Sequence, residues 1–334
     1  MNWLNPYSLI MDLRNKYYDV SENTQVILNR PVVSVGNITT GGSGKTPFIM
    51  YLIELLNRDR HTKSKLNVLV VSKSYKASLN KPQEVILDFK NAISLFGDEP
   101  CLIKQKYPDI FVWSGPSKSK TAEAALSYYQ TKNIKIDLIL IDDGFSHRRL
   151  KRNLDIVLID TSQSLKHYQM LPFGHLRENF KSLTRAQLII LTKVNQADPQ
   201  VFNFLKEKLQ KMNLNFIESN LLTTLNSAVA DNTTAFAFSG VANPLSFEKS
   251  LSDHKVHTLD HIKFPDHMMY TLENQNQIYQ RFLESKAQVL ITTAKDAVKI
   301  NHPELIKSIL VLGVKISISN SEEVKINETI CKLL

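Results

Sequence analysis

The chain has little cysteine and no long hydrophobic run. Its 334 residues include two cysteines, Cys101 and Cys331, with no CxxC pair and no cluster of cysteine and histidine. A disulfide framework and a structural zinc site are therefore not supported, and a reducing compartment fits best. No apolar run of about 18 residues is present, and the first residues do not form a basic leader before an apolar core. We expect neither a membrane-spanning nor a secreted protein.

Repeats and low-complexity tracts are also missing. Hydrophobic residues make up 43% of the chain and charged residues 22%, a balance that indicates a soluble globular protein and excludes a disordered or fibrous one. The 41 lysines and arginines outnumber the 32 aspartates and glutamates, so the formal net charge is +9. This excess favours anionic partners such as nucleotides, phosphorylated substrates, nucleic acid or acidic lipid headgroups. Charge alone does not choose among them.

Residues 1–20 combine an apolar surface with the basic side chains of Arg14 and Lys16. The apolar members are Trp3, Leu4, Tyr7, Leu9, Ile10, Leu13, Tyr17 and Tyr18. The pattern predicts an N-terminal amphipathic helix that lies in a membrane interface. A terminal helix packed against its own domain is the alternative, because an apolar stripe on a helix usually faces a core.

Short apolar runs separated by helix-length segments dominate residues 21–215. The predicted strands are 31–35, 66–71, 110–113, 136–141, 156–159 and 188–191, and the predicted helices follow Lys45 and cover 119–130 and 199–212. Strands that are apolar throughout, with helices between them, are typical of a parallel sheet covered on both faces. The sequence therefore predicts a doubly wound, mainly parallel α/β domain.

A second series of strands and helices predicts a smaller α/β lobe over residues 216–334. Its expected strands are 234–238, 256–259, 289–292 and 309–314, and its expected helices are 244–251, 272–284 and 322–333. The polar stretch 213–232 is the expected connection between the two parts. Two lobes place a natural cleft between them.

The most informative stretch is a strand that runs into a glycine-rich turn and then into Lys45 and Thr46. The residues expected to hold a nucleotide phosphate are Thr39, Thr40, Gly41, Gly42, Ser43, Gly44, Lys45 and Thr46. Glycines let backbone N–H groups converge on phosphate oxygens, Lys45 can reach the β- and γ-phosphates, and Thr46 can bind Mg²⁺. The strict GxxxxGK[ST] pattern has glycine where this chain has Thr39. The turn is nevertheless predicted to be a phosphate-binding loop.

Two acidic pairs and one aspartate–histidine pair are candidates for the remaining chemistry. Asp142 and Asp143 end a predicted strand, where one of them is expected to hold Mg²⁺ directly or through water. Asp98 and Glu99 lie in a turn ahead of a helix, where helix capping competes with a catalytic role. Asp266 precedes His267, and this pair either activates a hydroxyl group or belongs to an ordinary surface turn.

Two further segments leave alternatives open. Leu191 to Asn195 resembles the [NT]KxD element with which many GTP-binding proteins read guanine, but Asn195 stands at the acidic position, which weakens that reading. The basic run from His147 to Arg152 is either a solvated surface or a contact for an anionic lipid or phosphate.

Taken in order, these motifs resemble the tetraacyldisaccharide 4'-kinase family, lipid A pathway enzymes that phosphorylate a membrane-embedded glucosamine disaccharide. The matching segments are 34–37 with 41–47, 97–100, 142–147 with 155–160, 171–178, 238–244, 264–267 and 293–299. The resemblance covers nearly the whole chain, and Thr39 in the phosphate loop agrees with it.

The resemblance implies a P-loop kinase that uses ATP and Mg²⁺ and transfers the γ-phosphate to the 4'-hydroxyl of an acylated glucosamine disaccharide 1-phosphate. It implies a peripheral protein at the cytoplasmic face of the inner membrane, with no nucleic acid partner; the oligomeric state stays open. Asp98 would be the catalytic base with His267 as its partner, Lys45 would act on the phosphates, and Thr46, Glu99, Asp142 and Asp143 would serve the metal. His147, Arg177, Glu178 and Asp266 are the implied substrate or active-site residues.

Several positions depart from the family pattern and indicate a divergent member. Ser146 stands where the family has glutamine, Met268 where it has a second histidine, and Ala294 where it has glutamate, while residues 72–76 replace a Ser-Arg-Gly-Tyr-Gly element. Lys118 or Lys120 is expected where the family has an arginine near the phosphates. A GTP-driven switch or metallochaperone, and a membrane-surface protein without turnover, are the competing interpretations.

Overall fold

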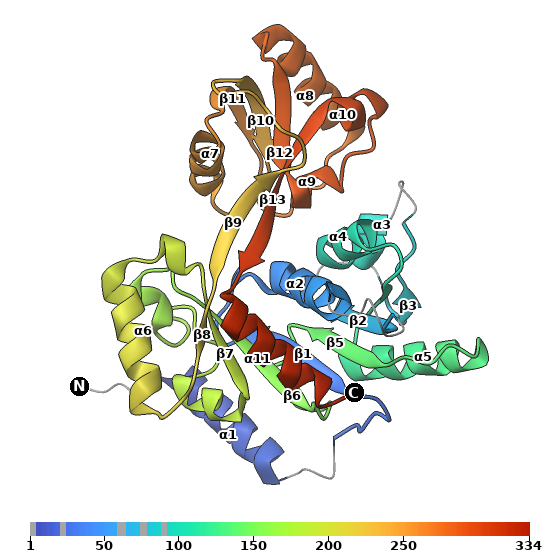
Figure 1. Cartoon of the computed structure of the whole chain (residues 1–334), viewed down its shortest axis with the longest axis vertical. Helices are drawn as coiled ribbons and strands as arrows, with labels where there is room; N and C mark the ends of the chain where they lie inside the picture. Colours follow the sequence, from blue (N-terminus) through green and yellow to red (C-terminus); the bar gives the residue numbers. More distant parts are fainter. Residues whose placement is uncertain (1–4, 21–24, 59–64, 74–78, 88–91) are drawn as a thin grey trace.

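The computed structural model describes residues 5–20, 25–58, 65–73, 79–87 and 92–334. Its chain forms a larger and a smaller lobe, which are joined by a narrow two-stranded ribbon (Figure 1). Trp3 and Leu4, and residues 74–76 of the departing segment, lie outside the described residues. None of the described helices is long and apolar enough to cross a bilayer.

The larger lobe is built on an eight-stranded sheet in the order β3-β4-β2-β5-β1-β6-β7-β8. All of its pairings are parallel except that of β3 with β4. The strands are β1 (Val32–Asn37), β2 (Val68–Lys73), β3 (Gln83–Glu84), β4 (Phe111–Gly115), β5 (Leu138–Asp142), β6 (Leu154–Asp160), β7 (Leu188–Thr192) and β8 (Ile217–Glu218). The mainly parallel sheet expected from the sequence is confirmed.

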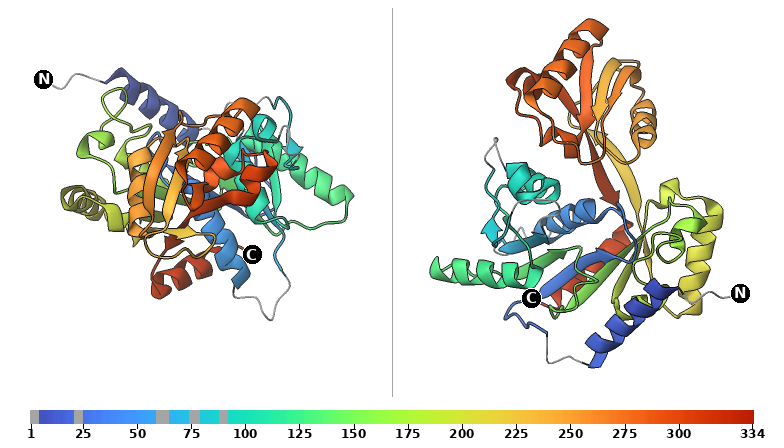
Figure 2. Two further views of the ribbon diagram at one scale, coloured as in Figure 1. Left: turned by 90° about the horizontal axis from the view of Figure 1, so that it is seen from above. Right: turned by 180° about the vertical axis from the view of Figure 1, so that it is seen from behind.

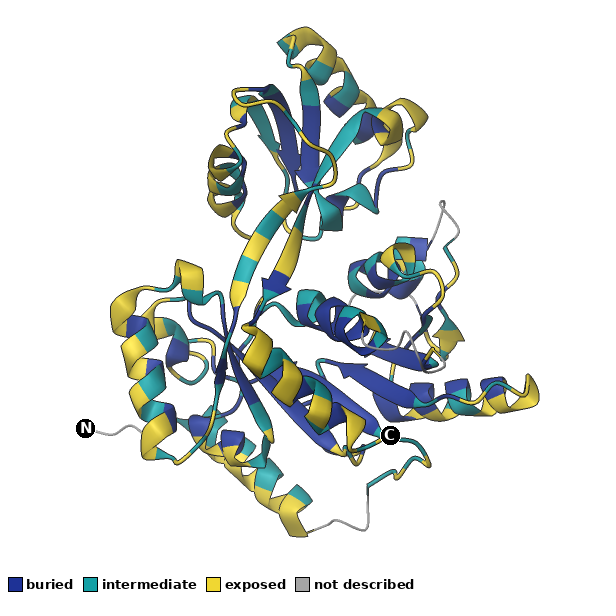
Figure 3. Cartoon of the chain, viewed as in Figure 1, coloured by how far each residue is buried: buried dark blue, intermediate teal, exposed yellow. Residues whose placement is uncertain are grey.

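Helices cover both faces of this sheet. Within β2, Val68 and Val70 pack into one hydrophobic cluster while Leu69 and Val71 pack into another, because successive side chains of a strand point to opposite faces. The α-helices that precede β8 in this lobe are α1 (Pro6–Val20), α2 (Lys45–Arg58), α3 (Ala92–Phe96), α4 (Asp98–Lys106), α5 (Lys118–Thr131) and α6 (Pro199–Lys211). The central strands are buried throughout (Figure 3). Burial on both faces explains why their sequences are apolar without alternation.

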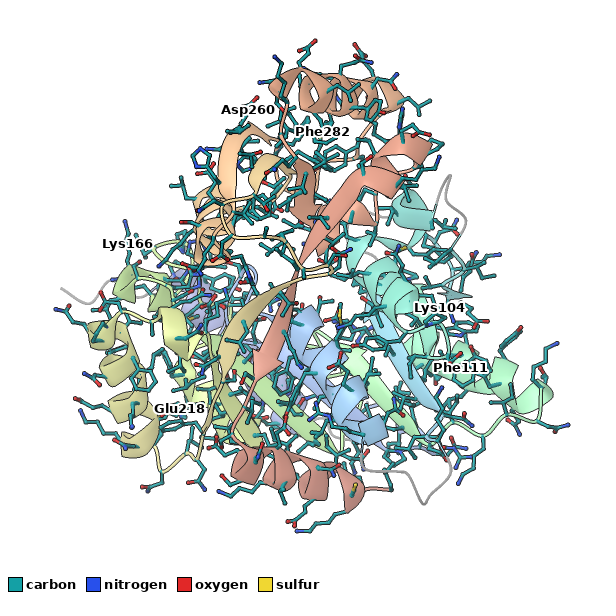
Figure 4. All side chains as sticks on the ribbon, turned by 45° about the horizontal axis from the view of Figure 1, so that its top comes forward. Lys104, Phe111, Lys166, Glu218, Asp260 and Phe282 are labelled. Atoms are coloured by element: carbon teal, nitrogen blue, oxygen red, sulfur yellow. The ribbon has the colours of Figure 1, made fainter. Side chains whose placement is uncertain are left out.

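The smaller lobe has a five-stranded sheet in the order β11-β10-β12-β13-β9. Its strands are β9 (Asn220–Leu225), β10 (Thr234–Ser239), β11 (His257–Lys263), β12 (Val289–Thr293) and β13 (Ile309–Ser317), and its helices are α7 (Pro244–Asp253), α8 (Leu272–Ser285), α9 (Ala294–Ala297) and α10 (Pro303–Ser308). Phe282, labelled in Figure 4, packs on Phe236 with a ring-centroid separation of 6.4 Å. The lobe therefore has its own hydrophobic core.

The connection between the lobes differs from the polar linker that we expected over residues 213–232. This stretch contains β8 and β9, and β9 pairs with β13 in an antiparallel register from Asn220 with Ser317 to Leu225 with Leu312. The alternating burial of β9 follows from its position in a ribbon with one exposed side. The sequence of β9 alone does not distinguish a strand from a loop, because its pairing partner β13 lies far along the chain.

The C-terminal helix α11 (Asn320–Cys331) returns to the larger lobe, although residues 216–334 were assigned to the smaller one. Ile326 and Ile330 are fully buried in the hydrophobic cluster that contains the α2 residues Phe48 and Leu52. The views of Figure 2 show that α11 lies beside the larger sheet, and that α1 lies at the end of this lobe away from the smaller lobe. The smaller lobe is therefore an insertion between β8 and α11.

Candidate active site

The predicted phosphate loop forms the turn between β1 and α2. Gly41 and Gly44 have φ angles of 99° and 87°, which L side chains rarely adopt. The rest of the turn is anchored from outside, since the Thr40 N–H donates to the His175 carbonyl and Thr192 Oγ1 donates to the Ser43 carbonyl at 3.2 Å. All eight predicted loop residues, 39–46, lie in this one turn or in the first residues of α2. Lys45 is the first residue of the helix, where backbone N–H groups favour an anion.

Asp142 lies at the carboxyl end of β5, directly beside β1, where its Cα pairs with that of Val35. Ser72 Oγ donates a hydrogen bond of 3.1 Å to Asp142 Oδ2. The other oxygen, Oδ1, is buried without a hydrogen-bond partner among the described residues. Burial raises the pKa of Asp142 and outweighs the opposing charges of Lys118 and Lys45.

Asp143 behaves in the opposite way because cations surround it. Arg177 Nη2 lies 3.0 Å and Lys45 Nζ 3.6 Å from Asp143 Oδ1, and the Lys118 ammonium donates to the Asp143 carbonyl. Although burial opposes ionisation, Lys45, Lys118 and Arg177 together lower the pKa of the Asp143 carboxyl. The pKa values of these two adjacent carboxyls are therefore shifted in opposite directions by their surroundings.

These residues fit a magnesium ion. The unpartnered Oδ1 of Asp142 is a buried carboxylate oxygen, and Thr46 carries a hydroxyl at the start of α2; these are oxygen ligands of the kind that Mg²⁺ prefers, and they would hold the ion together with a bound phosphate. The described part of the chain has no group of three or more His, Cys, Asp and Glu side chains arranged to hold a metal. Glu99 forms an ion pair of 3.1 Å with Lys295, and its negative charge adds to the burial that raises the pKa of Asp142.

Asp98 and His267 meet across the two lobes. Asp98 is the first residue of α4 in the larger lobe, and His267 follows β11 in the smaller one. His267 Nδ1 lies 3.1 Å from Asp98 Oδ2. His267 has a left-handed φ of 61°, and its backbone N–H donates to Asp266 Oδ1 at 3.0 Å. Two residues that are 169 positions apart are brought into direct contact.

The remaining predicted residues, Arg177, Glu178 and His147, have different surroundings. Arg177 contacts Asp143, so it belongs to the site. Glu178 has a fully buried side chain that accepts hydrogen bonds from Ser146 Oγ at 2.6 Å, Arg185 at 2.6 Å and Asn15 at 3.3 Å. Its oxygens are already engaged within the protein. His147 is half-buried, and burial followed by the charges of Lys118 and Lys73 lowers its pKa to about 4.

Sequence reasoning missed the roles of two lysines. Lys193 Nζ donates to the Gly42 carbonyl at 3.2 Å and also pairs with Asp160, so it braces the phosphate loop. Lys299 contacts Asp98 at 3.1 Å. Both lysines stand in motifs singled out from the sequence, but a lysine that contacts protein groups has no local pattern of its own.

The side chain that would have to contact guanine in a GTP-binding protein is engaged within this protein. The amide of Asn195 donates to the Leu221 carbonyl at 3.0 Å and accepts from the Leu221 N–H at 3.1 Å. Asn195 therefore contacts the start of β9, a strand of the ribbon that joins the lobes, and both polar groups of its side-chain amide are engaged.

The doubly wound sheet, the phosphate loop at the end of β1 and the carboxylates at the end of β5 together define a P-loop kinase. Comparison with known proteins agrees: the family model described as tetraacyldisaccharide-1-P 4'-kinase matches residues 3–334. The chain belongs to this family of lipid A biosynthesis.

Individual relatives show the same relationship. A tetraacyldisaccharide 4'-kinase of Bdellovibrio bacteriovorus is 36% identical over 88% of this chain and 86% of its own length. One from Bacteroides thetaiotaomicron is 30% identical over 98% and 92%. The crystal structure of an LpxK from Aquifex aeolicus in complex with ATP superposes with a TM-score of 0.74 at 27% identity, covering 98% of this chain and 96% of that one.

Proposed function

We propose that this chain transfers the γ-phosphate of ATP to the 4'-hydroxyl of tetraacyldisaccharide 1-phosphate and so produces the bis-phosphorylated lipid A precursor. The contact between Asp98 and His267 carries this proposal, because a carboxylate paired with a histidine across the two lobes suits a base and the partner that orients it. The family membership and the ATP complex of the Aquifex relative support the nucleotide and the acceptor.

The proposed reaction is a direct in-line transfer. Lys45 and the amides of residues 39–46 bind the β- and γ-phosphates, and Arg177 and Lys118 add positive charge around Asp143. The 4'-oxygen forms a bond to the γ-phosphorus while the bond to the β,γ-bridging oxygen breaks. The hydroxyl proton passes to the Asp98 carboxylate, which His267 orients, and ADP leaves.

Magnesium is part of this proposal. Thr46 and Asp142 are the residues that would hold it, with Glu99 and Asp143 close by. When bound, Mg²⁺ supplies positive charge that stabilises the phosphates during transfer. The free Oδ1 of the buried Asp142 supports this assignment, since a buried carboxylate oxygen needs a partner.

Peripheral binding to the cytoplasmic face of the inner membrane is also proposed, through α1. The helix has no buried residue, and it exposes apolar side chains, namely Leu9, Ile10, Leu13, Tyr17 and Val20. Its polar side is attached to the protein, since Arg14 donates to the Ser146 carbonyl at 2.6 Å and Arg148 pairs with Asp19 at 2.5 Å. An attached helix with an outward apolar side suits the headgroup region of a bilayer.

Purified protein with Mg²⁺, γ-labelled ATP or GTP, and detergent-dispersed tetraacyldisaccharide 1-phosphate tests the function. We expect labelled lipid from ATP, its loss in Lys45→Ala, and its near loss in Asp98→Ala with ATP binding retained. Release of free phosphate without labelled lipid, particularly from GTP, would overturn the proposal. Equal loss of ATP binding in both variants would contradict the role of Asp98.

A further inference from the structure

Lys299 lies at the contact between the two lobes, and the reaction described above does not use it. Its side chain is 0% exposed, and its ammonium lies 3.1 Å from Asp98 Oδ2 in the larger lobe. On its own lobe, the same ammonium lies 3.4 Å from Asp296 Oδ1, and the Asp296 side chain is also 0% exposed. One buried cation thus stands between two carboxylates from different lobes.

The arrangement at Asp98 is asymmetric. His267 Nδ1 and Lys299 Nζ both approach Oδ2, each at 3.1 Å. Among the described residues, Oδ1 has no hydrogen-bond partner. Lys299 and His267 therefore hold the same oxygen of the carboxylate and leave the other available to an acceptor hydroxyl.

Asp296 is itself held firmly, so Lys299 has a fixed support. The Gly240 N–H donates to Asp296 Oδ2 at 2.9 Å, and Thr293 Oγ1 donates to the same oxygen at 2.7 Å. Gly240 itself packs closely here, since a Cβ atom at this position would make tight contacts of 3.0 Å with the Tyr270 hydroxyl and 3.1 Å with Asp296 Oδ1. The support is built into β10, β12 and the start of α9.

We propose that Lys299 is a positioning residue for phosphoryl transfer: it orients Asp98 and balances the charges of Asp98 and Asp296 when the lobes are together. The inference rests on the proposed function, in which Asp98 accepts the hydroxyl proton. A buried cation between two carboxylates removes their mutual repulsion and fixes the geometry of both. Contact between the lobes thereby holds the Asp98 carboxylate in a fixed orientation.

Lys295 provides a matched comparison. It also crosses between the lobes, through its 3.1 Å ion pair with Glu99, but this pair is about one-third exposed, with side-chain exposures of 31% and 30%. Lys295 thus helps to hold the lobes together without contacting Asp98. If Lys299 only latched the lobes, the loss of either lysine would have the same kind of effect.

The decisive experiment compares Lys299→Met with the double variant Lys299→Met/Asp296→Asn. The single variant leaves two buried carboxylates without their cation and is expected to be less stable, whereas the double variant removes the uncompensated charge of Asp296. We expect the double variant to regain thermal stability while kcat stays reduced by about 10²-fold, the usual effect of removing one electrostatic group from an active site. The KM for ATP should stay close to the wild-type value, and Lys299→Arg should recover part of kcat.

The controls separate the possible failures. Lys295→Gln should lower kcat less than Lys299→Met does, and Lys307→Gln, on the exposed surface of the smaller lobe, should match the wild type. Full recovery of kcat in the double variant would show a purely structural role and overturn the inference. Wild-type protein that makes no labelled lipid would overturn the proposed function instead.

Discussion

At the scale of single residues, neighbouring side chains of one type acquire different properties. Asp142 and Asp143 are adjacent, yet burial raises the pKa of the first, while Lys45, Lys118 and Arg177 overcome burial and lower the pKa of the second. The two pKa values differ because Lys45 and Arg177 form ion pairs with the carboxylate of Asp143 and not with that of Asp142. Strongly shifted pKa values are common among the residues of functional sites.

His147 leads to a prediction about pH. Its pKa in the folded protein is about 4, against an ordinary value of 6.5, because burial and then Lys118 and Lys73 disfavour the charged ring. Between these two values the unfolded chain binds a proton that the folded chain does not. The free energy of unfolding should therefore fall as the pH drops from 6.5 towards 4.

Urea unfolding of the wild type and of His147→Gln at pH 7 and pH 5 measures this effect. The wild type should lose more stability than the variant between the two pH values, and the pair should show no such difference between pH 7 and pH 8. Parallel losses in the acidic range would contradict the pKa given to His147.

At the scale of elements, β1 depends on a close approach to the turn after β5. A Cβ atom at Gly36 would lie 2.5 Å from the Phe145 Cβ and 2.7 Å from the Phe145 backbone nitrogen. Because these atoms belong to or adjoin the backbone, they cannot move without shifting the turn that carries Asp142 and Asp143. The glycine thus allows β1 and the turn after β5 to pack together.

We expect Gly36→Ala to destabilise the protein by about 1–3 kcal/mol, the range for overpacking. Gly313→Ala is the control, since its Cβ would meet Thr224 atoms at 3.6 and 3.7 Å, which are ordinary contacts. Denaturant unfolding measures both, and equal stabilities for the two variants would refute the steric argument.

The apolar side of α1 gives a second prediction at this scale. Ile10 and Leu13 are 62% and 57% exposed, so Ile10→Ser/Leu13→Ser should leave folding intact. Each apolar side chain that enters the interface contributes roughly 1.5–3 kcal/mol when fully buried, so the double variant should bind vesicles at least about tenfold more weakly.

Sedimentation with vesicles that contain anionic phospholipid measures this binding. Leu283→Ser, at a position on α8 that is 53% exposed, is the control and should bind as the wild type does. Unchanged binding of the α1 variant would remove this helix from the proposed membrane contact.

At the scale of the whole molecule, the chain leaves the larger lobe through β9 and returns through β13 and α11. The ribbon continues the sheet of the smaller lobe, while Ile316, Ile326 and Ile330 enter the core of the larger one. The end of the chain therefore stabilises the lobe that carries the phosphate loop, through α2. Asp98 belongs to the larger lobe and Lys299 to the smaller lobe, and their ion pair is a further contact between the lobes besides the ribbon.

This topology predicts where a C-terminal mutation acts. Ile330→Ala should destabilise the protein by about 2–5 kcal/mol, because it removes a fully buried side chain from a packed core. Hydrogen exchange should rise in α2 of the larger lobe rather than in α7 or α8. Val324→Ala, at a position that is 56% exposed on the same helix, should have little effect, and faster exchange confined to the smaller lobe would contradict the argument.

The elements that could be predicted from sequence are those with a strong local pattern. The buried strands and the glycine-rich turn before Lys45 were recognisable because burial on both faces and phosphate binding each demand particular residues at close spacing. The order of the motifs was enough to indicate the family, and the resemblance implied the roles that are proposed for Asp98 and His267. Asp142 was expected at the site from its position at the end of a strand.

Only the tertiary structure decided the features that depend on distant partners. The pairing of β9 with β13, the return of α11, the saturation of Glu178 by internal hydrogen bonds and the contact of Lys299 with Asp98 all join residues whose local sequences are ordinary. Local patterns report burial and turn geometry, because these act within a few residues. Ion pairs and strand pairings are set by the approach of segments far apart in the chain, and no local spacing records that approach.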